Sequence, residues 1–70
     1  MTNQIGMFDK VALTEDQESS GLYRGMVGSV VEIYNQGEAY EVEFIDRDGK
    51  TYAVETIEAT KLLKLIYQPT

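Results

Sequence analysis

The chain has 70 residues, 43% of them hydrophobic, so it allows one small domain with the apolar content of a folded protein. Twelve acidic residues against six basic ones give a formal net charge of −6, which disfavours nucleic-acid phosphates and anionic lipids as partners. The absence of cysteine and histidine excludes disulfides, thiolate nucleophiles and imidazole acid–base chemistry.

The two ends of the sequence are predicted to be tails. Residues 1–6 show no periodicity, so we expect a flexible N-terminal tail, a domain over residues 7–67 and a short C-terminal tail over residues 68–70. The sequence contains no recognisable signal peptide and no apolar run of the roughly 18 residues that a transmembrane helix needs. A cytoplasmic protein without membrane attachment is therefore expected.

A first strand is predicted at residues 8–13, where Val11 and Leu13 flank Ala12 in an alternating pattern. The polar segment 15–21 that follows is predicted to be an acidic loop. Its carboxylates belong to Glu15, Asp16 and Glu18. Binding residues concentrate on loops of this kind, so we expect it to face a partner.

Residues 25–54 organise the rest of the chain as a three-stranded antiparallel meander. Its strands are predicted at residues 25–34, 38–45 and 50–54, with hairpin turns at residues 35–37 and 46–49. The spacing of Asp46 and Asp48 is similar to the start of a calcium loop, but Lys50 occupies a position where a ligand is needed. A turn is therefore the preferred interpretation.

The middle strand of the meander has a strict period of two. Tyr40, Val42 and Phe44 alternate with Glu41 and Glu43, which places apolar side chains on one face and carboxylates on the other. This pattern is typical of a half-buried antiparallel strand.

Gly25 and Gly28 bracket the start of the meander. Their spacing suits a tight turn into a strand, where glycine supplies a positive φ or lets another segment approach closely. No predicted helix and no further glycine or Lys-Ser/Thr pair complete a nucleotide-binding motif, so a phosphate site is not favoured.

The C-terminal part is predicted to contain one helical turn at residues 58–61 and a last strand at residues 63–67. A single amphipathic helix over residues 57–66 remains an alternative. The element order predicts an all-β fold, a small SH3-like five-stranded barrel with a 3₁₀ turn before the last strand. The predicted core consists of Val11, Leu13, Leu22, Val27, Val31, Ile33, Tyr40, Val42, Phe44, Tyr52, Val54 and Leu62.

Several segments together resemble a small bacterial family, common in cyanobacteria, known as domain of unknown function 4926. They are residues 11–16, 21–31, 38–44, 48–53 and 62–63, and the resemblance extends over residues 8–65. It implies an SH3-like fold and no established activity. Some members lie beside genes for toxin-like or nuclease-like proteins, which implies an acidic antidote or inhibitor.

No arrangement of residues in the sequence predicts catalysis. The carboxylates of Glu41 and Glu43 share a face, but an acid–base pair needs a cleft and one desolvated acid, and so small a barrel offers neither. We therefore expect a non-enzymatic protein-binding module without catalytic, cofactor or metal sites, steered electrostatically to a basic protein partner. The predicted protein-binding residues are Glu15, Asp16, Glu18, Tyr23, Tyr34, Glu41 and Glu43.

Three other interpretations stay open. A nucleic-acid-associated module would use Arg24, Arg47, Lys50 and the turn at residues 25–28, which resembles the glycine-centred motif of RNA-contacting SH3-like domains. A monomer could also form a weak homodimer or a small structural oligomer by pairing of edge strands. Finally, the acidic surface could serve only to keep the domain soluble.

Overall fold

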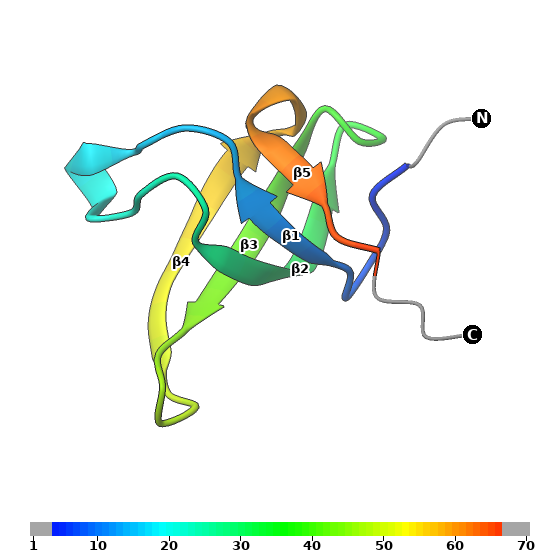
Figure 1. Cartoon of the computed structure of the whole chain (residues 1–70). Coiled ribbons are helices and arrows are strands. Elements are labelled where there is room, and N and C mark those ends of the chain that lie inside the picture. The colour runs from blue at the N-terminus through cyan, green and yellow to red at the C-terminus, as the bar shows by residue number, and fades with distance from the viewer. Residues whose placement is uncertain (1–3, 67–70) are drawn as a thin grey trace.

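The computed structural model describes residues 4–66 as five antiparallel strands and two single 3₁₀ turns, without an α-helix in that range (Figure 1). The elements are β1 (Lys10–Leu13), η1 (Glu18–Ser20), β2 (Val27–Tyr34), β3 (Ala39–Ile45), β4 (Thr51–Glu58), η2 (Ala59–Lys61) and β5 (Leu62–Lys64). All five strands belong to one sheet in the order β4-β3-β2-β1-β5. The predicted all-β class, the five strands and the 3₁₀ turn before the last strand are confirmed.

The sheet is open. Its edges are β4 and β5, and no strand pairing joins these two edges within residues 4–66, so closure into an SH3-like barrel is not observed. The helix alternative over residues 57–66 is wrong, because β4 continues to Glu58 and β5 occupies Leu62–Lys64. Tyr67 and the predicted C-terminal tail over residues 68–70 lie outside the described residues, as do residues 1–3.

Both predicted hairpin turns form, and local chemistry explains each of them. Between β2 and β3, three consecutive residues, Asn35–Gly37, adopt positive φ angles of 50°, 60° and 106°. Between β3 and β4, Asp46 Oδ1 accepts hydrogen bonds from the backbone N–H groups of Asp48 (2.9 Å) and Lys50 (3.0 Å). The Asp46 carboxylate thus closes a turn, as the sequence interpretation preferred.

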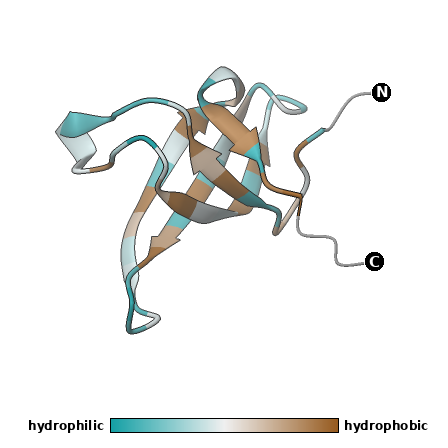
Figure 2. Cartoon of the chain, in the orientation of Figure 1, coloured by the Kyte–Doolittle hydropathy of each residue, from teal (hydrophilic) through white to brown (hydrophobic). Residues whose placement is uncertain are grey.

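The core lies on the inner face of the bent sheet. Its buried residues are Val11, Leu13, Leu22, Val30, Tyr40, Val42, Phe44, Ile57 and Leu62. Seven of these nine were predicted, and Val30 and Ile57 were missed. Figure 2 shows the complementary pattern, with hydrophilic residues gathered in the loop between β1 and β2 and in the turn between β3 and β4.

A β-bulge in β2 explains the errors on that strand. Val30 pairs with Val42 and Glu32 pairs with Glu41, so Val31 has no partner of its own on β3. The extra residue resets the alternation. Val30 is therefore fully buried while Val31 is only half-buried, contrary to the prediction.

Three further residues predicted for the core are exposed: Val27 (48%), Tyr52 (52%) and Val54 (44%). On β4 the inward positions are Ala53, Glu55 and Ile57, because these pair with the inward residues of β3. Val54 therefore projects outward, and Tyr52 lies at a second irregularity of the ladder. The remaining expected core residue, Ile33, is half-buried and packs against the cluster.

Candidate functional site

The solvent-facing side of β2, β3 and β4, called the outer face below, carries a group of carboxylate and hydroxyl side chains. Directly opposite residues of antiparallel strands share a face, so the strand register defines the members of this one. They form three sets of cross-strand neighbours: Ser29, Glu43 and Val54; Glu32, Glu41 and Thr56; Tyr34, Ala39 and Glu58.

Three carboxylates on the outer face, Glu32, Glu41 and Glu43, form an acidic row. Glu32 pairs directly with Glu41, and like charges at such a position destabilise a sheet. Glu41 Oε1 accepts hydrogen bonds from Thr56 Oγ1 (2.6 Å) and the Tyr34 hydroxyl (3.4 Å). Glu43 Oε2 accepts one from Thr51 Oγ1 (2.5 Å).

Hydroxyl donors do not neutralise the acidic row. Lys10 Nζ donates to Ser29 Oγ (2.6 Å) in the depression that Glu43 also lines, and within residues 4–66 no cation forms an ion pair with Glu32, Glu41 or Glu43. Across residues 4–66, the ion pair that forms is Lys64 with Asp9 (3.3 Å), and it lies away from the outer face. Desolvation, together with the charges of Glu41 and Glu32, raises the pKa of Tyr34 above 10.0, because each effect disfavours the tyrosinate. The raised pKa acts in the same direction as the hydrogen bond, in which the protonated Tyr34 hydroxyl donates to Glu41.

Apolar side chains surround the Glu43 end of the acidic row. Val27, Ile45 and Val54, called the apolar patch below, are exposed by 48%, 48% and 44%. Val27 and Ile45 line a depression of about 160 Å³ together with Lys10, Gly28, Ser29 and Glu43. They also border a depression of about 420 Å³ whose other lining residues are Met26, Phe44, Asp46, Arg47 and Tyr52. The sequence interpretation missed this patch because it assigned Val27 and Val54 to the core.

The loop between β1 and β2 carries the other predicted binding residues, and its carboxylates differ in role. Glu15 and Glu18 are exposed, whereas Asp16 Oδ1 accepts the backbone N–H of Arg24 (2.9 Å) and so closes the loop. The Tyr52 hydroxyl donates to the carbonyl oxygen of Gly21 (3.1 Å) and ties the loop to β4.

The seven predicted binding residues therefore fall into two groups. Tyr34, Glu41 and Glu43 meet on the outer face, as the spacing predicted for the two glutamates. Glu15, Asp16, Glu18 and Tyr23 stay together on the loop that precedes β2, whereas Tyr34 ends that strand (Figure 1). An eight-residue strand is about 25 Å long, so Tyr34 lies far from this loop, whereas Glu43, opposite Ser29, lies near the start of the strand.

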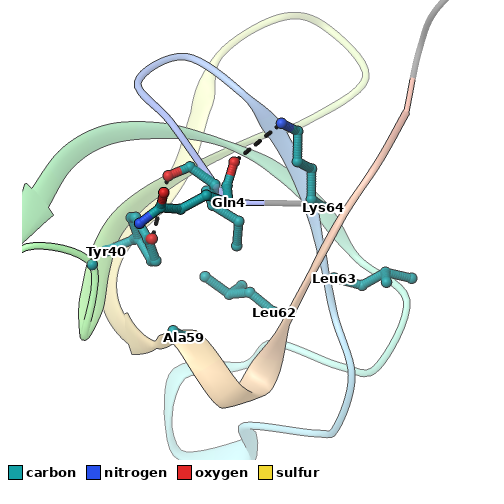
Figure 3. Close-up of a pocket in the computed structure, with 8 residues that line it drawn as sticks. Gln4, Tyr40, Ala59, Leu62, Leu63 and Lys64 are labelled. Carbon is teal, nitrogen blue, oxygen red and sulfur yellow. Dashed lines mark hydrogen bonds between the residues drawn. The ribbon is translucent and has the colours of Figure 1, made fainter. Parts of the chain in front are cut away.

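A third depression, of about 360 Å³, opens between the N-terminal segment, η2 and β5 (Figure 3). Its polar groups already hold the N-terminal segment in place. The Tyr40 hydroxyl donates to the Ile5 carbonyl oxygen (3.3 Å), and Lys64 Nζ donates to that of Gln4 (3.1 Å). We therefore interpret this depression as part of the packing of the chain end.

Two other kinds of site are absent from residues 4–66. No group of three or more acidic side chains in residues 4–66 is arranged so that it could hold a metal ion. Within the same range, no helix has the length and hydrophobicity to cross a membrane.

Comparisons with known proteins give one match. No curated protein and no solved structure matches the chain significantly. A family model described as "Domain of unknown function (DUF4926)" matches residues 7–64, which is most of the chain. The chain therefore belongs to this family of unknown function.

Proposed function

We propose that this chain is a non-enzymatic, SH3-like protein-binding domain of the cytoplasm, and that its outer face docks on a basic protein. The strand order, the long loop after β1 and the 3₁₀ turn before β5 support the SH3-like assignment. The observation that carries the binding role is the position of the exposed apolar patch directly beside an acidic row without paired cations.

The two parts of the outer face would contribute differently to binding. Burying a half-exposed Val27 or Ile45 stabilises a complex by about 1 kcal/mol each, so the apolar patch supplies affinity. The acidic row attracts and orients a partner that carries lysine or arginine around an apolar centre. With a formal net charge of −6, the domain is suited to cover a basic surface, as an antidote or inhibitor of a neighbouring-gene product would.

The nucleic-acid alternative has less support from the arrangement of the basic residues. Arg24 belongs to the loop before β2, whereas Arg47 and Lys50 belong to the turn between β3 and β4. This loop and this turn meet at one end of the outer face, where Met26 and Arg47 line the same depression. The acidic row begins beside it at Glu43 and would repel a phosphate backbone.

A charge-matched pair of variants tests the proposal. Glu41→Lys/Glu43→Lys reverses charge on the outer face, and Glu15→Lys/Glu18→Lys makes the same change of charge on the loop. Affinity capture from nuclease-treated native extract at low salt is compared for wild type and both variants, and the captured protein is identified by mass spectrometry.

A basic protein that wild type and the loop variant capture, and that the outer-face variant loses, supports the proposal. Val27→Ser should weaken the same capture by roughly fivefold, since it removes apolar contact without changing charge. Equal loss with both charge variants would mean that only overall charge matters. Capture that no variant alters would contradict a role for the outer face.

A further inference from the structure

The strand β4 is an edge strand of eight residues. It pairs with β3 on one side, and within the described residues no strand pairs with its other side (Figure 1). We propose that this free edge receives an extended segment of the partner that bears lysine or arginine, which adds to the sheet as a sixth strand. The inference rests on the proposed function and specifies how the partner is bound.

The register identifies the backbone groups that are available. Beside β4, the N–H of Ala59 donates to the carbonyl oxygen of Glu38 (2.9 Å), so these two residues form a hydrogen-bonded pair. Hydrogen-bonded and non-hydrogen-bonded pairs alternate along an antiparallel ladder. The N–H and C=O groups of Val54, Thr56 and Glu58 therefore point away from β3.

This edge has few of the features that prevent edge strands in other proteins from pairing with a further strand. Short length, proline, lysine and bulges are the usual devices, together with a charge on the inward side. The sequence of β4 contains no proline and no lysine, and its ladder irregularity lies at its beginning, near Thr51. Only Glu55, opposite the buried Val42, provides an inward charge. The other edge strand, β5, has only three residues.

The carboxylates around β4 favour a positively charged segment at this edge. An added strand would project its side chains alternately to both faces of the sheet. On the inner face they would approach Glu55, and on the outer face Glu58, with Glu41 and Glu43 on the next strand. Lysine or arginine is thus favoured on either face. A second copy of this chain would instead bring its own Glu55 and Glu58 toward the same carboxylates.

The test uses a capped eight-residue peptide that alternates lysine and valine, added to ¹⁵N-labelled protein. Amide hydrogen exchange is followed by NMR at the three edge positions, Val54, Thr56 and Glu58. When the peptide occupies the edge about 90% of the time, an edge amide can exchange only during the remaining tenth. Its exchange should therefore be about tenfold slower than without peptide. The amides of Glu55 and Ile57, which face β3, should change little.

Two controls isolate the backbone contact. Thr56→Pro removes one edge N–H, whereas Thr56→Val keeps it, and both variants lose the hydroxyl that donates to Glu41. We expect the proline variant to bind the peptide about tenfold more weakly and the valine variant to bind like wild type. A peptide N-methylated at every residue has no backbone N–H on either edge and should fail to protect the edge of wild-type protein. This comparison keeps the test decisive if the proline variant does not fold.

Three results would overturn the inference. One is unchanged exchange at the edge amides in the presence of the peptide, and another is equal protection by the N-methylated peptide. The third is edge protection without peptide that increases with protein concentration, because a second copy would then occupy the edge.

If the peptide shifts only outer-face signals such as those of Glu43 and Ile45, the edge inference fails and the proposed function stands. The proposed function fails separately, if the outer-face variant captures partners like wild type.

Discussion

Gly25 and Gly28 are three residues apart but serve different physical purposes. Gly28 is buried, and a Cβ built on it would lie 2.6 Å from Val42 Cγ1 and 2.8 Å from the Glu43 carbonyl oxygen. Gly25 has open space around it and a φ of +91°, which few other residues adopt without strain. The two explanations offered for this glycine pair, close approach and positive φ, therefore each apply to one residue.

We expect Gly28→Ala to destabilise the fold by about 1–3 kcal/mol, because the atoms it meets belong to the core and to a strand backbone. Gly6→Ala is the matched control, since Gly6 has no positive φ and the nearest atom to its built Cβ, Asp9 Oδ2, is 3.7 Å away. The control should change stability by less than about 0.5 kcal/mol. Urea unfolding measures both variants. Equal stability of the two would show that β2 and β3 can separate to accept the methyl group.

At the level of elements, the clarity of the sequence pattern decided which strands were predicted correctly. On β3 the apolar and charged residues alternate strictly, so Tyr40, Val42 and Phe44 could point in only one direction. On β4 both faces carry apolar residues, and the pattern favoured Tyr52 and Val54 over Ile57. The pairing with β3, which no local pattern encodes, chose the other face.

The bulge in β2 can be tested with two neighbouring valines. Val30→Ala should cost about 2 kcal/mol of unfolding free energy, because Val30 is fully buried opposite Val42. Val31→Ala should cost less than about 1 kcal/mol, because Val31 is half-buried and has no partner on β3. Chemical denaturation compares the two. The reverse order of stabilities would restore the uninterrupted alternation that places Val31 in the core.

For the whole molecule, charge is the dominant property. Six basic and twelve acidic residues give the formal net charge of −6, yet within residues 4–66 only Lys64 and Asp9 form an ion pair. We expect this unpaired charge to keep copies of the domain apart, although the apolar patch and the edge of β4 are exposed. Under the proposed function, repulsion between copies would leave these surfaces free for a basic partner.

Lowering the pH should remove this protection. Near the isoelectric point of about 4.3, carboxylates become protonated, the net charge approaches zero, and we expect self-association that reverses at neutral pH. Static light scattering across a pH series measures it. Glu15→Lys/Glu18→Lys changes the formal charge from −6 to −2, since each replacement adds two, and should move the onset to higher pH. Scattering that does not depend on pH in either protein would contradict this account.

The sequence by itself determined the all-β class, the two hairpin turns, the 3₁₀ turn, most of the core and the family, because local periodicity, turn chemistry and a specific run of residues carry that information. It also predicted that Glu41 and Glu43 share a solvent-facing side. Only the tertiary structure decided that the sheet stays open, that a bulge buries Val30, and that Val27 and Val54 lie beside these glutamates on the outer face. These features depend on register between strands, and register is fixed by contacts between segments that are distant in the chain.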